Sequence, residues 1–157
     1  MLTIIQVTTG AEIATVRDLF LEYQQLLGID LCFQGFEAEV SSLPGAYAPP
    51  GGRLLLALLD DVPAGCVALR ALDPPRCEMK RLFVRPSARG RGIGVALVSR
   101  VLDEARALEY LEIVLDTIPS MTEAQQVYER FGFRDIPAYR LNPIAGTRYL
   151  AKALAEP

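Results

Sequence analysis

The spacing of apolar residues predicts a strand and a long helix at the start of the chain. Residues 2–7 are mostly apolar and favour a short strand. After Gly10, apolar residues recur every three or four positions, which places them on one face of a helix. They are Ile13, Val16, Leu19, Phe20, Tyr23, Leu26 and Leu27. Gly28 is expected to end this helix, because glycine readily adopts the left-handed backbone of a helix C-cap.

The middle of the chain predicts a short helix followed by three strands. The helix is expected at about 36–42, before Pro44 and Gly45. Turn-forming residues at 60–63 and 73–75 separate three apolar segments. These predicted strands are 53–59, 64–72 and 77–84. Three consecutive strands with short turns favour an antiparallel meander.

The second half alternates helices and strands. A helical pattern runs from Gly92 to Leu108, and another follows Pro119 and Ser120 and ends at Gly132. The strands predicted around them are 111–115, about 133–140 and 145–152. We see no linker or repeat, so residues 1–157 are expected to form a single α+β domain, antiparallel first and βα-like later.

The composition argues against several classes of partner and of catalytic site. The formal net charge of −3 argues against nucleic acid as a partner, since binding its backbone requires a basic face. The absence of histidine removes the commonest general base, the usual catalytic triad and most zinc sites, and we expect no metal. One acid-free segment of twelve residues is basic and is expected to attract a small polyanion. Its cations are Lys80, Arg81, Arg85, Arg89 and Arg91.

The cysteines and the longest apolar run indicate in which cellular compartment the protein is expected. Cys32, Cys66 and Cys77 are odd in number and form no CxxC motif, which is typical of reduced thiols. Cys66 and Cys77 fall in predicted strands and are expected to be buried. The run Leu54–Leu59 is too short to span a membrane, and Met1–Ile5 lacks the features of a secretory signal. We therefore expect a soluble cytoplasmic protein without a membrane partner.

The segment Arg89–Gly94 has the composition of an anion site. It alternates glycine with arginine between an apolar strand, Leu82–Val84, and a helix start. Glycine lets backbone N–H groups approach a ligand closely, and the first N–H groups of a helix are unpaired at the positive end of its dipole. Together these features predict a phosphate or pyrophosphate site.

Two common phosphate motifs do not match this segment. A P-loop needs Lys and Ser or Thr after its last glycine, where this chain has Val95 and Ala96. The dinucleotide fingerprint Gly-x-Gly-x-x-Gly fails because its third glycine would be Val95 or Leu97. Asp116 does imitate the ribose-binding acid of such proteins, but the remaining chain supplies too few parallel strands. A Rossmann-type dinucleotide binder is therefore the weakest alternative.

The segment Leu82–Gly94 resembles motif A of the GNAT superfamily of N-acetyltransferases. The motif core, Gln/Arg-x-x-Gly-x-Gly/Ala, is matched by Arg89, Gly92 and Gly94. The segment Ala124–Phe133 is similar to a second family motif, a helix with Ala and Tyr that closes on Gly-Phe. The resemblance implies a mixed central sheet of about six to seven strands, splayed between the fourth and fifth, with about four helices.

The sequence departs from the family pattern at one position, and the resemblance also implies a coenzyme. Many members carry Asn where this chain has Met121-Thr122, which puts one coenzyme contact in doubt. The co-substrate implied is acetyl-CoA, with its pyrophosphate on the N–H groups of residues 91–95. The coenzyme-binding residues implied are Leu82, Phe83, Val84, Arg89, Gly90, Arg91, Gly92, Ile93, Gly94, Val95, Thr117, Ala124 and Tyr128.

The resemblance also assigns catalytic roles. Tyr128 would protonate the leaving thiolate as general acid, although it could equally fill the core. The backbone N–H of Val84 would stabilise the thioester carbonyl as an oxyanion donor. The base is left open between Glu78, Asp116 and water. Glu78 could instead be a solvated strand residue paired with Arg70 or Lys80.

The acceptor is the part that the sequence specifies least. The resemblance places its site at Leu31, Cys32, Phe33 and Gln34 and at Tyr139 and Asn142. The function implied is transfer of the acetyl group to a primary amine, small molecule or peptide, by direct attack in a ternary complex. Nearby Asp30, Glu37 and Glu39 could favour a cationic amine. The alternative is a catalytically silent module that binds acetyl-CoA or CoA, and a homodimer is left open because many relatives dimerise.

Overall fold

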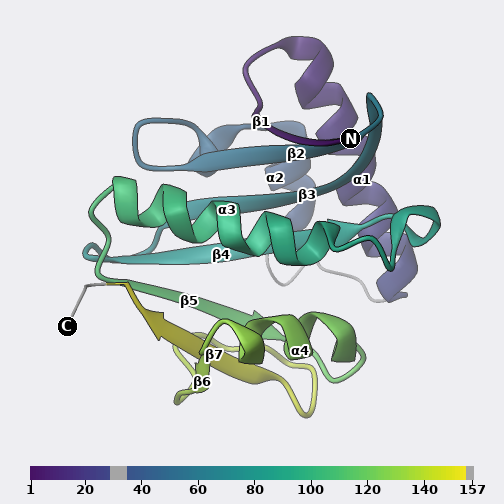
Figure 1. The fold of residues 1–157 in the computed structure, drawn as a ribbon. Helices are drawn as coiled ribbons and strands as arrows, with labels where there is room; N and C mark the ends of the chain where they lie inside the picture. Colours follow the sequence, from purple (N-terminus) through teal and green to yellow (C-terminus); the bar gives the residue numbers. More distant parts are fainter. Residues whose placement is uncertain (29–34, 155–157) are drawn as a thin grey trace.

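A computed structural model describes residues 1–28 and 35–154, and their strands form one seven-stranded sheet with helices on both faces (Figure 1). The elements, in chain order, are β1 (Leu2–Gln6), α1 (Gly10–Leu27), α2 (Phe36–Ser41), the 3₁₀ turn η2 (Gly45–Tyr47), β2 (Arg53–Leu59), β3 (Val62–Ala71), β4 (Arg76–Val84), the 3₁₀ turn η3 (Pro86–Ala88), α3 (Ile93–Ala107), β5 (Glu112–Thr117), α4 (Thr122–Arg130), β6 (Arg134–Asp135) and β7 (Arg148–Ala153). None of the helices in these two ranges is long and apolar enough to cross a membrane.

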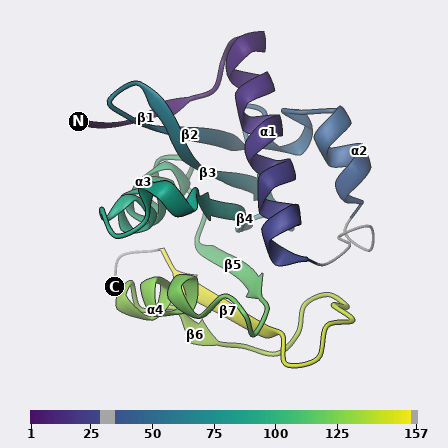
Figure 2. The ribbon, with the colours of Figure 1, turned by 90° about the vertical axis from the view of Figure 1, so that its right-hand side faces the viewer.

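The sheet is mixed and opens near its centre. Its strand order is β1-β2-β3-β4-β5-β7-β6, and every neighbouring pair is antiparallel except β4 and β5. These two pair only where residues 76–78 lie beside residues 112–114. Beyond Glu78 the two strands diverge, as Figure 2 shows. The predicted mixed sheet and its splay between the fourth and fifth strands are therefore confirmed.

Two hydrophobic layers enclose the sheet. Helices α1 and α2 cover one face, while α3 and α4 cover the other (Figure 2). Along β2, Leu54 and Leu56 belong to the core under α1, whereas Leu55 and Ala57 belong to the core under α3. Because successive strand residues face opposite sides, burial of both faces explains the uninterrupted apolar run of this strand.

Helix α1 has the termini that its sequence predicts. Thr9 accepts a hydrogen bond from the N–H of Glu12, and the Glu12 carboxylate accepts one from the N–H of Thr9, which forms a capping box. Gly28 adopts a left-handed conformation, φ +64°, and its N–H donates to the carbonyls of Gln24 and Gln25. The predicted helix end at Gly28 is confirmed.

A β-bulge reorients the end of β4. Between the pairs Cys66–Phe83 and Ala68–Lys80, β4 has one more residue than β3, and Arg81 has a φ of +61°. The bulge changes the alternation of side chains, so that Leu82 joins the core under α3 and Phe83 the core under α1. The last residues of β4 are thereby presented at the opening of the sheet.

Three sequence predictions need correction. The strand expected at about 133–140 is only Arg134–Asp135, and the chain then forms an irregular segment up to β7. The turn expected at 60–63 is confined to Asp60 and Asp61, because β3 begins at Val62. Both aspartates have positive φ, +50° and +65°, as expected for the tight turn of a twisted hairpin.

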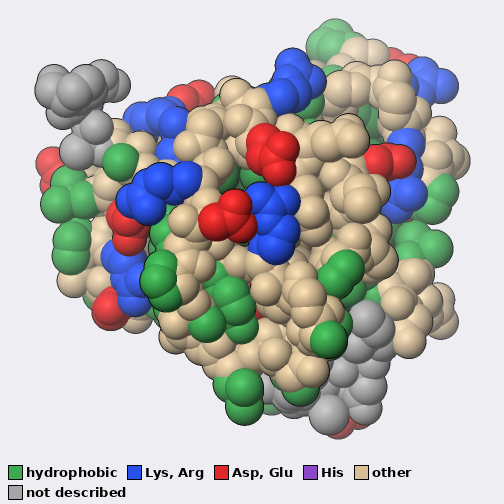
Figure 3. Space-filling view, turned by 90° about the horizontal axis from the view of Figure 1, so that it is seen from below, with side chains coloured by type: hydrophobic (Ala, Val, Ile, Leu, Met, Phe, Trp, Pro, Cys, Tyr) green, Lys and Arg blue, Asp and Glu red, His purple; other side chains and the backbone are tan. Residues whose placement is uncertain are grey.

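The third correction concerns the predicted basic segment, which is not one surface. Lys80 and Arg81 are buried, and Arg85 forms a bidentate ion pair with Glu22. Only Arg89 and Arg91 of the five cations are exposed. On the face of the molecule seen in Figure 3, basic and acidic side chains lie next to one another.

The cysteines in the strands are buried, as predicted. Cys66 and Cys77 are free thiols with no exposed surface, and burial raises the pKa of Cys77 to about 12. Cys32 lies outside the described residues.

The contact between β3 and the end of β4 generates a stability prediction. A Cβ at Gly65 would lie 2.5 Å from the carbonyl oxygen of Phe83, which is backbone and cannot easily yield. We expect Gly65→Ala to lower the free energy of unfolding in urea by about 1–3 kcal/mol. Gly10→Ala, where nothing lies within 4 Å of the added Cβ, is the matched control. Equal stability of the two variants would contradict the close contact.

Candidate active site

A groove of about 440 Å³ runs from the glycine-rich loop to the opening of the sheet. It is bounded by the end of β4, the start of α3, the start of α4 and the last turn of α1. Its lining includes ten of the residues predicted to bind the coenzyme: Leu82, Phe83, Val84, Arg89, Gly90, Gly92, Ile93, Gly94, Val95 and Ala124. The two motifs of the sequence, far apart along the chain, therefore face the same groove.

Other predicted coenzyme residues lie elsewhere. Arg91 is exposed but does not line the groove. Thr117 is buried outside it, and its hydroxyl oxygen has no hydrogen-bond partner among the described residues. Tyr128 lines an adjoining cavity instead.

Sequence reasoning missed two parts of the groove wall. They are Tyr23, Leu26 and Leu27 of α1, and residues 120–123 before and at the start of α4. The sequence placed Leu26 on the apolar face of this helix, but in the structure it is exposed and lines the groove. For the second part, the resemblance points to Met121-Thr122, the position of the family's Asn, but leaves that contact in doubt, and Ser120 and Glu123 carry no signal.

The glycines give the loop its shape. Gly90 and Gly92 have φ values of +79° and +76°, which side chains with a Cβ rarely adopt. Gly92 is the N-cap of α3, and its carbonyl accepts the N–H of Ala96 at 3.0 Å. The preceding N–H groups, those of residues 93–95, consequently have no acceptor within the helix. This end of α3 can hold an anion, as the sequence predicts.

Within residues 1–28 and 35–154, no strand pairs with the β4 edge that faces β5 beyond Glu78. The N–H of Arg85 donates to the carbonyl of Ala64 in β3 at 2.8 Å. Since successive N–H groups of a strand point to opposite edges, that of Val84 is directed away from β3 and toward the opening. The carbonyl of Val84 accepts a hydrogen bond from Nε of Arg89 at 3.2 Å.

A small cavity of about 40 Å³ lies where β4 and β5 part. It shares four wall residues with the groove, so the two spaces adjoin: Tyr23, Leu27, Leu82 and Met121. Tyr128 lines this cavity and is only 5% exposed. Burial raises the pKa of Tyr128 well above its usual value, and Tyr23 and Asp116 add to the effect. Its phenol is thus protonated at neutral pH and able to donate a proton.

Asp116 and Asn142 also line this small cavity. The amide nitrogen of Asn142 donates to the carboxylate of Asp116 at 3.2 Å, and the amide oxygen accepts the N–H of Ile144 at 3.0 Å. Asn142, predicted from the sequence to contact the acceptor, therefore lies beside the position where β5 ends.

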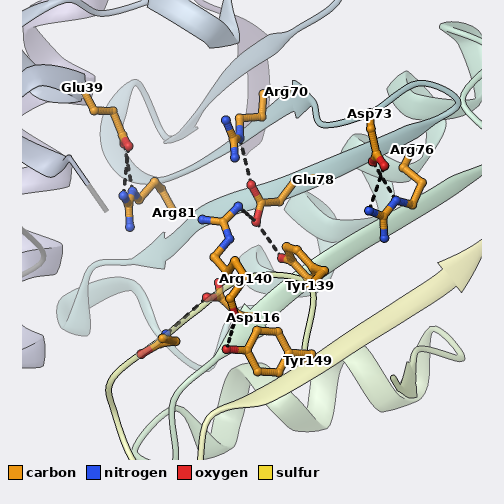
Figure 4. Close-up of polar contacts among 11 residues, drawn as sticks. Glu39, Arg70, Asp73, Arg76, Glu78, Arg81, Asp116, Tyr139, Arg140 and Tyr149 are labelled. Atoms are coloured by element: carbon orange, nitrogen blue, oxygen red, sulfur yellow. Dashed lines mark hydrogen bonds and ion pairs between the residues drawn. The ribbon is translucent and has the colours of Figure 1, made fainter. Parts of the chain in front are cut away.

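Glu78 is at the centre of a buried ionic cluster (Figure 4). Its carboxylate has no exposed surface and accepts hydrogen bonds from Nε of Arg70 at 2.8 Å, from the hydroxyl of Tyr139 at 2.6 Å and from Nη2 of Arg140. Burial alone would raise the pKa of Glu78, but Lys80, the bond from Tyr139 and the two arginines outweigh it and lower the pKa. The expected pairing with Arg70 is confirmed, whereas a solvated position is wrong.

The other residues that the sequence predicts to bind the acetyl acceptor fall into two groups. Tyr139 does not line the small cavity but buttresses the carboxylate of Glu78. Leu31, Cys32, Phe33 and Gln34 lie outside the described residues, as does Asp30.

Comparisons with known proteins agree with this geometry. Residues 15–133 match the family model described as "Acetyltransferase (GNAT) family". An uncharacterised N-acetyltransferase of Schizosaccharomyces pombe is 38% identical over 140 residues, which are 88% of this chain and 86% of the yeast protein. The N-acetylaspartate synthetase of Rattus norvegicus is 38% identical over 91 residues, 57% of this chain but only 30% of the rat protein.

A solved structure shares the fold. A Salmonella typhimurium protein, described as an acetyltransferase with its cofactor acetyl-CoA, superposes with a TM-score of 0.73 at 18% identity, over 99% of this chain and 95% of that one. The motifs, the opened sheet and these relatives lead to one conclusion: the chain belongs to the acetyltransferase (GNAT) family of N-acetyltransferases.

Proposed function

We propose that this protein transfers the acetyl group of acetyl-CoA to a primary amine by direct attack in a ternary complex. The observation that carries the proposal is that the groove adjoins the small cavity, whose wall includes Tyr128. The groove runs from the start of α3, where an anion would bind, to the edge of β4 at the opening of the sheet, and the adjoining cavity contains the proposed proton donor, Tyr128. The Salmonella structure, which holds acetyl-CoA in the same fold, supports the choice of co-substrate.

The residues present suit this coenzyme. The helix start at Gly92–Val95 would hold the pyrophosphate through backbone N–H groups, and exposed Arg89 would add a positive charge. The free edge of β4 offers backbone groups of Leu82 and Val84 to the amides of the pantetheine arm, as a neighbouring strand would. Ala124 and Val127 of α4 supply apolar wall on the opposite side.

The chemistry then follows from three groups. The amine nitrogen attacks the thioester carbonyl carbon, and the N–H of Val84 stabilises the negative charge that develops on the oxygen. The C–S bond breaks, and Tyr128 donates its proton to the departing sulfur. The nitrogen loses its proton to a base.

For the base, the structure favours Asp116, directly or through water, over Glu78. The carboxylate of Asp116 lines the small cavity, whereas that of Glu78 lines neither the groove nor this cavity and already accepts three hydrogen bonds. We propose that Glu78 positions Arg70, Tyr139 and Arg140 instead.

A silent acetyl-CoA-binding module is the competing function. Both functions predict thermal stabilisation by acetyl-CoA. They differ when an amine is added, because only an enzyme then releases free thiol from acetyl-CoA.

The proton donor is tested by Tyr128→Phe. Because the variant keeps the ring and loses only the hydroxyl, we expect kcat near neutral pH to fall by about 100-fold or more, with little change in the KM for acetyl-CoA. The matched control is Tyr110→Phe, whose hydroxyl donates to the carbonyl of Gly51 at 2.7 Å far from the groove. That control should lose stability rather than turnover. Unchanged turnover of Tyr128→Phe would rule out its role as the acid.

The anion site is tested by Arg89→Glu. We expect acetyl-CoA to bind about 10-fold more weakly, with a smaller dependence on salt, as measured by calorimetric titration. The matched control is Arg130→Glu. Arg130 is exposed at the C-terminal end of α4, whereas the N-terminal end of this helix borders the groove. This variant makes the same change to the net charge and should bind acetyl-CoA as the wild type does. If both variants bound equally, the charge at the loop would not contribute.

A further inference from the structure

The described walls of the groove and of the small cavity share four residues, and among these only Tyr23 has a side chain with a polar hydrogen. The four are Tyr23, Leu27, Leu82 and Met121. The acetyl group of a coenzyme bound in the groove has to pass these residues to come beside Tyr128, which lines the small cavity. A thioester placed for reaction would therefore lie next to Tyr23.

The hydroxyl of Tyr23 is directed across the place where the two spaces meet. It donates a hydrogen bond to Sδ of Met121 at 3.7 Å, so it extends from α1 toward the N-cap of α4. A thioether sulfur is a weak acceptor. A carbonyl oxygen that a ligand brings to the same place would therefore replace Met121 as the acceptor of this hydrogen bond.

The end of β4 supports the ring of Tyr23. The rings of Tyr23 and Phe83 meet edge to face, with centroids 5.9 Å apart and planes at 68°. Phe83 is buried in the core under α1 and directly precedes Val84, whose N–H is directed toward the opening of the sheet. Neighbouring residues of one strand thus hold both the Val84 N–H and the Tyr23 hydroxyl, which fixes these two donors before a ligand binds.

The phenol of Tyr23 keeps its proton at neutral pH. Burial raises the pKa of Tyr23 to about 12. The nearby Arg81 guanidinium acts against the rise, while the Asp116 carboxyl and the Cys66 thiol add to it. Arg81 is itself held by a bidentate ion pair with Glu39, at 2.8 and 2.9 Å, as Figure 4 shows. A protonated phenol beside a cation is suited to donate a hydrogen bond to negative charge on a ligand.

We propose that Tyr23 is a second oxyanion donor, which binds the thioester carbonyl oxygen together with the backbone N–H of Val84. This proposal rests on the proposed acetyl transfer and adds a catalytic residue to it. The carbonyl oxygen is the strongest acceptor at the reacting end of acetyl-CoA, and Tyr23 supplies a hydroxyl where the groove and the small cavity meet.

The hydroxyl acts while the carbonyl oxygen carries negative charge. The amine nitrogen forms a bond to the carbonyl carbon, and the π electron pair moves to the oxygen, where the two donors bind it. The nitrogen gives its proton to Asp116, directly or through water. The electron pair then restores the C=O bond as the C–S bond breaks, and the sulfur takes the proton of Tyr128. Tyr23 keeps its own proton throughout, so its role differs from that of Tyr128.

The variant Tyr23→Phe removes the hydroxyl and keeps the ring against Phe83. We expect kcat for thiol release in the presence of an amine to fall by about 100-fold, because one oxyanion donor is lost. The Kd of acetyl-CoA, measured by calorimetric titration, should change by less than about threefold, because the lost bond strengthens only as charge develops on the oxygen. Wild-type kcat in this variant would overturn the proposal and leave acetyl transfer intact.

The matched control is Tyr47→Phe. Tyr47 is also a buried phenol whose pKa responds to Glu39 and Arg81, but it lines neither the groove nor the small cavity. Removal of its hydroxyl should leave kcat unchanged. An equal fall of kcat in both variants would show that the hydroxyl of Tyr23 acts only by supporting the Glu39–Arg81 pair, and would overturn the proposal.

The pH dependence of kcat distinguishes a hydrogen-bond donor from a group that exchanges its proton. With a pKa of about 12, Tyr23 stays protonated from about pH 6 to 9. Tyr128 and Cys66, which influence it, also keep their protons there, because burial raises the pKa of each. The ratio of kcat between the wild type and Tyr23→Phe should therefore be constant over this range. A ratio that declined toward one as the pH rose would contradict the role of Tyr23 as a donor.

A spectroscopic measurement separates failure of this proposal from failure of the transferase proposal. The carbonyl stretching frequency of acetyl-CoA labelled with ¹³C at the carbonyl carbon is recorded without an amine. Hydrogen bonds to the oxygen polarise the C=O bond and lower this frequency. We expect a downward shift on binding to the wild type and to Tyr47→Phe, and a smaller shift on binding to Tyr23→Phe.

Each outcome of this measurement has a distinct meaning. Equal shifts in the wild type and Tyr23→Phe would overturn the proposal, even if no amine were acetylated. A smaller shift in Tyr23→Phe, in a protein that releases no thiol with any amine, would support the contact with Tyr23 and contradict only the transfer reaction.

Discussion

The early parting of β4 and β5 is the constraint on which the rest of this structure depends. The two strands pair only through residues 76–78 and 112–114 and then diverge. Divergence leaves one edge of β4 without a strand partner in the described part of the chain, and buried backbone groups without partners are costly. A ligand with amide groups is the natural substitute for the missing strand. The bulge at Arg81, the loop at Gly90–Gly92 and the start of α4 all border this opening.

The ionic cluster around Glu78 ties the two halves of the sheet together at the same place. Glu78 lies on β4, and its partners come from β3 and from the segment that precedes β7. Removing one member of such a buried cluster leaves uncompensated charge and typically costs about 3–5 kcal/mol. The cluster thereby holds Arg70 and Arg140 in place through Glu78, the same carboxylate that the sequence analysis considered as a base.

Local patterns predicted most of the fold. Periodicity located α1, α3 and α4, and Pro44 and Gly45 marked the end of α2. The glycine-rich segment between a strand and a helix led to the prediction of an anion site, and the structure places it at the start of α3. The predicted strand at 133–140 was wrong because Tyr139 and Arg140, which look like strand residues, point at Glu78 instead of joining β7. A side chain that is 61 positions from its partner leaves no signal in a periodic pattern.

The partners of the basic residues could not be predicted from the sequence either. Along the chain, Lys80, Arg81 and Arg85 form one basic run with Arg89 and Arg91, but alternation and the bulge send them to different places. Arg81 pairs with Glu39 and Arg85 with Glu22, partners that only the packing of α1 and α2 brings near. The cavity lined by Arg70, Lys80 and Arg140 is built from such long-range placements, so its lining could not be inferred from the order of residues.

The central claim is that the opened edge of β4 receives the coenzyme and delivers its acetyl group beside Tyr128. A crystal structure of the protein with acetyl-CoA tests it most directly. We predict the pyrophosphate on the N–H groups of Ile93–Val95, the thioester carbonyl oxygen on the N–H of Val84, and the sulfur next to the hydroxyl of Tyr128. A coenzyme bound outside the groove, or an acetyl group that does not reach the space between β4 and β5, would contradict the account.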